Sequence, residues 1–380
     1  MLSREENEMM TKVGPGTPAG EMLRRYWWPI GFAEEVKAKG RPNKIKLLGE
    51  EFVLFRDGTG KLGLLGVHCA HRGASLQFGR VEDQGIRCCY HGWVYDVDGK
   101  CLEQPAEPDE STFKDRVKQP AYGVEELGGL IFAYVGPAPV PLLPRYDLLV
   151  NNEGTRVLTG WEEHCNWLQR AENHVDQSHI PFLHASGYPD MAFKKPILDY
   201  ERTWYGVRAS LSVAGRTKPK ITHCIFPSHL RFSSARVSHK PQHRLAFRVP
   251  IDDTETISYT VTFYPESGSE LVLTTKGLRR RSPGQYSRVE DGYWGIESND
   301  QDVVVLEGLG PIFDRSTEHL AVTDRGVVML RKMIQESIEA ASKGSDPIGV
   351  IRNENQQPGG VISFDASIQE IEALKQAATA

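Results

Sequence analysis

The chain has no long hydrophobic run and no excess of positive charge, and each absence excludes a class of protein. No apolar stretch approaches the roughly 20 residues that a membrane-spanning helix needs, so we expect no membrane association. With 45 Lys and Arg against 50 Asp and Glu, the net charge is −5, which offers no basic surface to a nucleic acid. The first residues also lack the apolar segment of a secretory signal, which indicates a cytoplasmic protein.

Cysteine is scarce, and a nucleotide-binding glycine motif is missing. Six cysteines in 380 residues do not indicate a disulfide framework, and clustered cysteines in a reducing compartment more often serve metals or catalysis. No Gly-x-Gly-x-x-Gly motif follows a predicted strand, so the chain has no evident dinucleotide or flavin site of its own. Apolar residues at 39% and charged residues at 25% are ordinary for a globular protein.

The order of the sequence patterns predicts two domains, formed by residues 1–145 and 146–380. Short β-rich runs from about 30 to 135, separated by turn residues, predict a compact antiparallel β domain. The prolines between Pro137 and Pro144 then mark the boundary between the domains, because such a stretch cannot continue a helix or a central strand.

The second domain is predicted to have a central antiparallel sheet with flanking helices. Residues 162–179 have a helical pattern, and residues 200–275 are mainly typical of strands. Residues 325–342 repeat apolar side chains at helical spacing and predict an amphipathic helix. The fold class of the whole chain is therefore expected to be α+β.

Two short motifs in the first domain combine cysteine with histidine. They are Cys69-x-His71 and Cys88-x-x-His91, and each follows a β-rich run. Side by side, two such loops bring two thiolates and two imidazoles together, a set that can hold zinc or an iron–sulfur cluster. Zinc sites usually pair Cys-x-x-Cys with two histidines, so a structural zinc site is the weaker alternative. Cys89 is off this spacing and is interpreted as a buried strand thiol.

A second group of polar residues lies in the first part of the second domain. His179 and His184 are five residues apart, so on an unbroken helix their side chains diverge by about 140°. Pro181 disfavours helical geometry at the preceding residue, and a break there lets the two imidazoles converge. Two histidines with one carboxylate form the facial triad of non-haem Fe(II) oxygenases. Asp176, three residues before His179, is one candidate for the carboxylate.

Both motifs resemble those of one protein family. The segment CAHRGASLQFGRVEDQGIRCCYHGW resembles the Rieske [2Fe–2S] motif, and ENHVDQSHIPFLH resembles the mononuclear-iron motif of Rieske non-haem iron ring-hydroxylating oxygenase α-subunits. The opening ENEMMTKVGPGTPAGEMLRRYW resembles the phthalate-dioxygenase branch of that family. The resemblance implies a [2Fe–2S] cluster and a mononuclear Fe(II), with metal ligands Cys69, His71, Cys88, His91, His179 and His184 and one carboxylate.

The resemblance also implies which carboxylate binds the iron. In the family, the inner Asp of the motif hydrogen-bonds a ligand His and a cluster His of the neighbouring subunit, a role that falls to Asp176 here. The ligating Asp comes from far downstream, where NDQDVVVLEG offers Asp300 and Asp302, and its pattern favours Asp302. Asn173 is either a polar residue close to the iron or an amide on the face of a helix.

The function implied by the resemblance is that of a terminal oxygenase component. It activates O₂ at the mononuclear iron with electrons relayed by the Rieske cluster, and hydroxylates or O-demethylates an aromatic, carboxylated substrate. A separate NAD(P)H-dependent reductase, with or without a ferredoxin, is expected to supply the electrons, and a homotrimer or a dimer of trimers is the expected assembly. EQPAEP and RSTEHLAVTD look closest to O-demethylases of aromatic acids.

The expected carboxylate of the substrate needs a cation at the site. Arg208, in a predicted strand, is the candidate because a guanidinium matches a carboxylate in geometry, although a surface position on the strand is the alternative. Two other functions remain open from the sequence: a Rieske-type electron-transfer protein without oxygenase activity, and a zinc-stabilised binding module.

Overall fold

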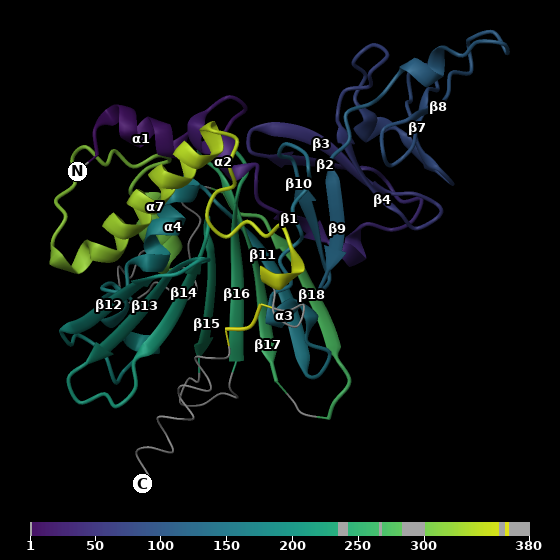
Figure 1. Ribbon diagram of the computed structural model, residues 1–380. Coiled ribbons are helices and arrows are strands. Elements are labelled where there is room, and N and C mark those ends of the chain that lie inside the picture. The colour runs from purple at the N-terminus through teal and green to yellow at the C-terminus, as the bar shows by residue number, and fades with distance from the viewer. Residues whose placement is uncertain (1, 235–241, 266–267, 283–300, 357–361, 365–380) are drawn as a thin grey trace.

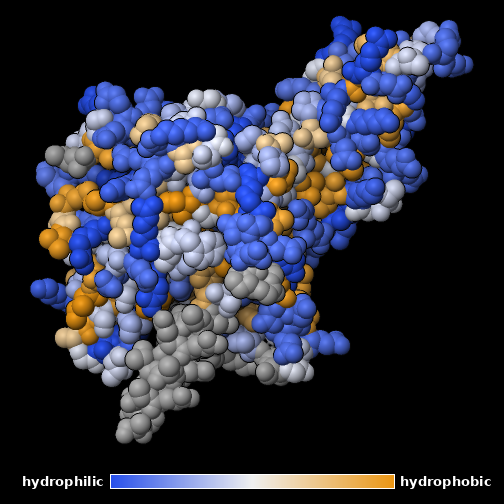
Figure 2. Space-filling view, viewed as in Figure 1, coloured by the Kyte–Doolittle hydropathy of each residue, from blue (hydrophilic) through white to orange (hydrophobic). Residues whose placement is uncertain are grey.

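The computed structural model describes residues 2–234, 242–265, 268–282, 301–356 and 362–364. In this part of the chain, a small β domain projects from a larger body made of one long sheet and its helices (Figure 1). Both halves of the predicted α+β architecture are therefore present, and the predicted fold class is confirmed. Figure 2 shows hydrophobic surface gathered where the small domain meets the larger body.

The small domain is built from antiparallel sheets with the strand orders β1-β10-β9, β2-β3-β4 and β5-β6-β7-β8. A separate apolar cluster, which includes Val53, Phe55 and Tyr95, underlies the last of these sheets and fixes its loops. The strands are β1 (Trp28–Phe32), β2 (Asn43–Leu47), β3 (Glu50–Arg56), β4 (Leu62–Gly66), β5 (Arg80–Glu82), β6 (Gly85–Arg87), β7 (Val94–Tyr95), β8 (Cys101–Glu103), β9 (Gly123–Leu127) and β10 (Leu130–Tyr134).

The larger body contains one long sheet with the order β12-β13-β14-β15-β16-β17-β11-β18. Its neighbouring strands are antiparallel, as expected from the sequence, except that β11 and β18 run parallel. The strands are β11 (Thr155–Glu163), β12 (Pro196–Arg202), β13 (Gly206–Val213), β14 (Lys220–Ile225), β15 (His229–Ser234), β16 (Gln242–Pro250), β17 (Thr256–Tyr264) and β18 (Val272–Arg279).

Helices cover one face of the long sheet (Figure 1). They are α1 (Arg4–Thr11), α2 (Pro18–Leu23), α4 (Trp167–Val175), α5 (Ile180–Leu183), α6 (Gln301–Gly308) and α7 (Arg325–Ser342). The short helix α3 (Asp147–Val150) lies on the other face, where Asp147 pairs with Arg231 of β15 at 3.1 Å. The bounds of α7 agree with the prediction, and its buried apolar side chains recur at helical spacing. Among the described helices, none is both long enough and apolar enough to pass through a bilayer.

The N-terminal helices pack on the larger body, although they precede the small domain in the sequence. Helix α2 contacts α7, and the hydroxyl of Tyr26 donates a hydrogen bond to the carbonyl of Ile348 at 2.7 Å. Lys12 forms an ion pair with Asp253 at 3.0 Å. The division at residue 145 stays a prediction, and these contacts attach the first helices to the body rather than to the β domain.

The helix predicted over residues 162–179 is wrong at both ends. Glu162 and Glu163 belong to β11, where the side chains alternate between buried and partly exposed positions, as in a strand. Helix α4 ends at Val175, and Pro181 lies in the first turn of α5 rather than at the end of α4. Proline is favoured in the first turn of a helix. The backbone N–H groups of that turn have no acceptor within the helix, so proline loses no hydrogen bond by lacking one. The break predicted between the two histidines is therefore wrong: the chain leaves helical geometry before His179, and His179 and His184 flank the short helix α5.

A buried ionic cluster joins α1, α4 and α7. The carboxylate of Glu172 accepts hydrogen bonds from Arg315, at 2.8 Å to Nη2, and from Arg331, at 2.7 Å to Nε. Arg315 also donates to Asn7, and Arg331 to Glu318. Burial works to raise the pKa of Glu172, but the two guanidinium charges outweigh it and lower that pKa. The carboxylate is therefore ionised and holds three helices together.

Glu172→Gln is expected to destabilise the larger body by roughly 3–5 kcal/mol, because it leaves buried guanidinium charge without its counter-charge. Urea unfolding followed by circular dichroism measures the effect. Glu339→Gln, which removes an exposed partner of Lys343 on α7, is the matched control and should change stability by less than about 1 kcal/mol. Equal unfolding midpoints for the two variants would contradict the structural role of Glu172.

Candidate metal centres

Two loops of the small domain have nearly the same backbone conformation. In the first, the N–H of Gly73 donates to the carbonyl of Cys69 at 2.8 Å, and in the second the N–H of Gly92 donates to Cys88 at 3.1 Å. Both glycines have φ of 75°, a left-handed conformation that glycine adopts without strain. Each cysteine therefore lies at the same position of a matching turn. The two thiols can face one metal group that lies between the two loops.

The four predicted cluster ligands lie together at these loops. Cys69 and Cys88 are buried, and burial, together with the neighbouring Cys69 thiol, raises the pKa of Cys88. The rings of His71 and His91 are only partly buried, with centroids 4.6 Å apart. Sulfur donors inside and imidazole donors outside match a two-iron cluster with one iron on each side. The donor set therefore fits a Rieske-type cluster.

Other side chains fix these loops, and most of them could not be identified from the sequence. The ring of His71 stacks on Trp93, with centroids 4.2 Å apart and planes 8° apart. The hydroxyl of Tyr95 lies 3.2 Å from Cys69 Sγ. The side chain of Gln119 is fully buried. It accepts a hydrogen bond from the backbone N–H of Ala70 and donates to the carbonyls of Gly66 and His68, where β4 leads into the first loop.

One cysteine prediction is wrong. Cys89 is exposed, not a buried strand thiol, because residues 89–91 form the turn of the second loop. The other three cysteines outside the motif, at 101, 165 and 224, are buried.

His179, His184 and Asp302 converge on one point of the larger body. One potential ligand atom from each side chain lies within 4.8 Å of the other two. Asp302 Oδ1 lies 3.1 Å from His184 Nε2 and 3.6 Å from His179 Nε2. The turn between α4 and α5 carries the first histidine, the end of α5 carries the second, and the first turn of α6 carries the aspartate. Two imidazoles and one carboxylate in this arrangement suit Fe(II).

Each imidazole is oriented from behind by another side chain. His184 Nδ1 donates to Gln301 Oε1 at 2.8 Å, so its Nε2 lone pair faces the centre. His179 Nδ1, which is buried, lies 3.6 Å from Asp176 Oδ2 on the side away from the centre. Gln301 was not identified from the sequence; its position directly before Asp302 on α6 is the only signal for it.

Asn173 and the charges around Asp302 fix the carboxylate. Asn173 Nδ2 donates to Asp302 Oδ1 at 3.2 Å, which places this amide beside the triad rather than on a solvent-facing side of the helix. Burial works to raise the pKa of Asp302, but His184, His179 and Arg170 outweigh it and hold that pKa well below its ordinary value. The carboxylate is therefore ionised at neutral pH, as a metal ligand must be.

Arg208 is not brought to the triad. In the sheet it pairs with His223, whereas the next residue, Ala209, pairs with Thr222. Thr222 faces α4, because its hydroxyl donates to Gln177 Oε1 at 3.1 Å. Since successive side chains of a strand point to opposite faces, Arg208 lies on the face away from α4, where its Nη1 is 3.4 Å from Glu201 Oε2. Its predicted contact with the substrate has no support in this geometry.

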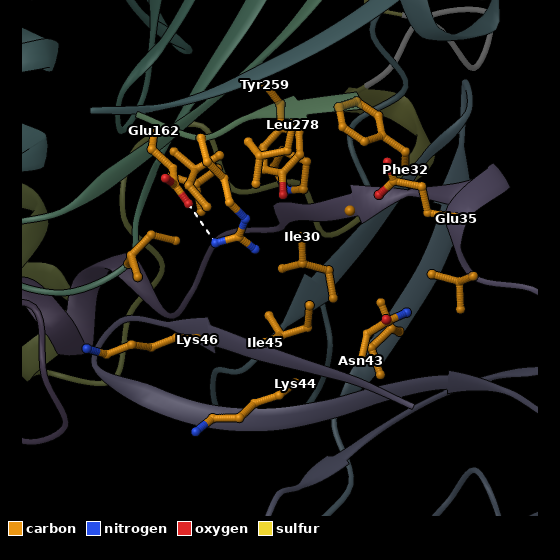
Figure 3. Close-up of a pocket in the computed structure, with 18 residues that line it drawn as sticks. Ile30, Phe32, Glu35, Asn43, Lys44, Ile45, Lys46, Glu162, Tyr259 and Leu278 are labelled. Atoms are coloured by element: carbon orange, nitrogen blue, oxygen red, sulfur yellow. Dashed lines mark hydrogen bonds and ion pairs between the residues drawn. The ribbon is translucent and has the colours of Figure 1, made fainter. Parts of the chain in front are cut away.

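A cavity of about 370 Å³ lies elsewhere, between β1 and β2 of the small domain and the long sheet (Figure 3). Its lining includes Ile30, Ile45 and Leu278, and also the ion pair of Glu162 with Arg280 at 3.0 Å. None of the triad residues lines it. The cavity therefore belongs to the junction of the two parts and not to the metal centres.

Comparison with known proteins gives matches over both parts of the chain. Residues 26–120 match the Rieske [2Fe-2S] domain, and residues 284–379 match the family described as LigXa C-terminal domain like. The chain is 35% identical over 378 residues to the 5,5'-dehydrodivanillate O-demethylase oxygenase subunit of Sphingobium sp. (strain NBRC 103272 / SYK-6), covering 93% of this chain and 84% of that protein. It is 30% identical over 428 residues to the phthalate 4,5-dioxygenase oxygenase subunit of Pseudomonas putida, covering 97% and 93%.

A solved structure shares the fold at lower identity. The oxygenase in the reduced complex between oxygenase and ferredoxin of carbazole 1,9a-dioxygenase has a TM-score of 0.62 and 19% identity, covering 91% of this chain and 96% of that chain. Rieske oxygenases carry a [2Fe–2S] cluster and a mononuclear iron, and both donor sets described above fit these cofactors. The chain therefore belongs to the Rieske non-haem iron oxygenases, as a terminal oxygenase subunit of the phthalate-dioxygenase-like branch.

Proposed function

We propose that the two groups of side chains hold the two cofactors of this oxygenase. Cys69, His71, Cys88 and His91 are assigned to the [2Fe–2S] cluster, and His179, His184 and Asp302 to the mononuclear Fe(II). The convergence of three ligand atoms within 4.8 Å, from α4–α5 and from the distant α6, is the observation that carries this assignment. The second ring nitrogen of each imidazole also faces a polar side chain, Gln301 for His184 and Asp176 for His179, as is usual for a metal-bound histidine.

The bound iron supplies the oxygen chemistry, and the surrounding side chains prepare the site for it. Gln301 accepts the Nδ1–H of His184 at 2.8 Å, and the carboxylate of Asp176 lies 3.6 Å from His179 Nδ1, so that a polar side chain stands behind each ring. Asn173 donates to one oxygen of Asp302, so the carboxylate cannot rotate freely. A protein ligand set of three leaves positions open for oxygen and substrate, which is what an oxygenase needs.

Electrons are proposed to arrive from another subunit. In a single chain, the loops beside β7 lie at the far side of the small domain from α4 (Figure 1). A homotrimer, or a dimer of trimers, that sets the cluster of one subunit beside the iron of the next brings the two centres together, with Asp176 bridging His179 and a cluster histidine. A separate NAD(P)H-dependent reductase, with or without a ferredoxin, fits the oxygenase–ferredoxin complex that shares this fold. The cytoplasm remains the proposed location.

The substrate is proposed to be an aromatic compound that is hydroxylated or O-demethylated. O-demethylation is favoured, because a relative that is 35% identical over nearly the whole chain is an O-demethylase oxygenase subunit.

Metal analysis with an absorption spectrum tests this function. The purified protein is expected to contain about three irons and two acid-labile sulfides per chain and to be coloured. About two irons and two sulfides indicate an electron carrier without an oxygenase centre, and zinc without sulfide indicates a structural metal site. Either of these results would overturn the proposal.

A further inference from the structure

Lys220, the first residue of β14, faces the same side of the sheet as the metal triad. Its neighbours on that side are Thr222 and Cys224, two and four residues further along the strand. Both of them contact the segment that leads to the triad: Thr222 donates to Gln177 Oε1 at 3.1 Å, and Cys224 Sγ to the carbonyl of His174 at 3.2 Å. Lys220 therefore lies beside the segment that carries His179.

The ammonium group of Lys220 makes its direct contacts with neutral groups. Its Nζ donates to Thr222 Oγ1 at 2.9 Å and lies 5.0 Å from the centroid of the Phe232 ring. Among the residues that the structure describes, no carboxylate forms an ion pair with Lys220, whereas nearby Arg216 pairs with Asp190 at 3.3 Å. A partly buried cation of this kind is costly unless an anion accompanies it.

Electrostatics place this charge near the iron ligands. Burial lowers the pKa of Lys220 to about 8, and its positive charge works to lower the pKa of His184. The negative charge of Asp302 acts on Lys220 in turn. At neutral pH the amine is still mostly protonated, so the side of the sheet that faces the triad carries this positive charge.

We propose that Lys220 is the residue that binds the anionic substituent of the substrate, and that this substituent is the carboxylate of an aromatic acid. The inference rests on the proposed oxygenase function and deepens it by naming a specificity residue. The ammonium supplies a point charge with two further protons to donate. The ring of Phe232 beneath it offers an aromatic face on which a substrate ring can pack.

This geometry also explains why Arg208 is the weaker candidate. Arg208 lies on the opposite face and already has Glu201 beside it. The two cations thus stand on the two sides of one sheet, and exchanging either for a neutral side chain tests the two faces separately.

Binding of paired ligands to the iron-loaded protein, measured by calorimetry, tests the proposal without requiring turnover. The probes are 3-methoxybenzoate and 3-phenoxybenzoate, each compared with its neutral carboxamide. The wild-type protein is expected to bind the acids about tenfold to hundredfold more tightly than the amides, the range for a hydrogen bond to a charged group. Lys220→Gln is expected to abolish that preference, while Lys220→Arg and Arg208→Gln keep it.

Three outcomes overturn the proposal: equal binding of acids and amides by the wild type, no binding of either acid, or a preference that survives in Lys220→Gln. Loss of the preference in Arg208→Gln but not in Lys220→Gln overturns it as well and moves the anion to the other face. Circular dichroism checks that each variant is folded, and Lys220→Arg keeps the test valid if the Gln variant is not. Iron and sulfide are counted on the same samples. A missing mononuclear iron contradicts the proposed oxygenase function, whereas a full iron content without a preference for the acids contradicts only the role of Lys220.

Discussion

Asp302→Ala is expected to lower the iron content from about three atoms per chain to about two, while the sulfide content stays near two. The carboxylate is the only anionic member of the triad, and it lies within hydrogen-bonding distance of His184 Nε2 and Asn173 Nδ2. Without it, two neutral imidazoles remain, and the divalent ion loses its charged ligand. Turnover should fall to background, because the Rieske cluster alone cannot bind oxygen beside a substrate.

The matched control for this variant is Glu307→Gln. Glu307 lies on the same helix, five residues further on, and accepts from the backbone N–H of His164 instead of facing the triad. It should keep all three irons. Asp300, the second candidate of the sequence, lies outside the described residues, so Asp300→Ala belongs in the same series. Full iron in Asp302→Ala with loss of iron in Asp300→Ala would reverse the assignment.

Asp176→Asn is expected to keep both cofactors and lose most of the turnover, by roughly 10- to 100-fold or more. The carboxylate lies 3.6 Å from His179 Nδ1, and burial, which works to raise the pKa of Asp176, is outweighed by His179 and Ser178, so that the pKa is lowered. An amide has nearly the same shape and can still accept from Ser178 N, so the local turn should survive. What is lost is the negative charge behind the imidazole and the proposed bridge to the neighbouring subunit's cluster.

Single-turnover measurements with a pre-reduced cluster separate the possible causes. If the bridge is correct, the rate at which the cluster is reoxidised in the presence of substrate falls, while the spectrum and the iron count remain those of the wild type. Asp199→Asn removes an exposed carboxylate on β12 and serves as the control. Wild-type reoxidation rates in Asp176→Asn would argue strongly against the bridge.

The sequence was sufficient where a motif carried its own chemistry. Cys69, His71, Cys88 and His91 lie together because each loop contains its proposed ligands and its turn glycine within a few residues. Asp302 lies 118 residues from His184, and no spacing rule joins such distant positions. It was identified only through the resemblance to a family pattern, and the fold then set it 3.1 Å from the imidazole.

The sequence was insufficient where the outcome depended on which side of a strand a residue occupies. Arg208 and Lys220 both lie in strands of the same sheet, and nothing in their local pattern distinguishes the two faces. The register between β13 and β14 decides it, by pairing Lys220 with Leu211 and Arg208 with His223. Gln301 and Gln119 were missed for a similar reason, because a buried glutamine is recognisable only from the groups that it contacts.

The attachment of the first helices to α7 has a consequence for engineering. Because residues before Trp28 pack on the larger body, the polypeptide leaves that body, forms the electron-transfer module and then returns to it after Tyr134. In topological terms the module is an insertion rather than an N-terminal appendage. Exchanging the module for that of another oxygenase therefore requires two splice points. A chimera joined at a single crossover near residue 145 would also exchange α1 and α2, and the foreign helices would then have to pack on α7 of this chain.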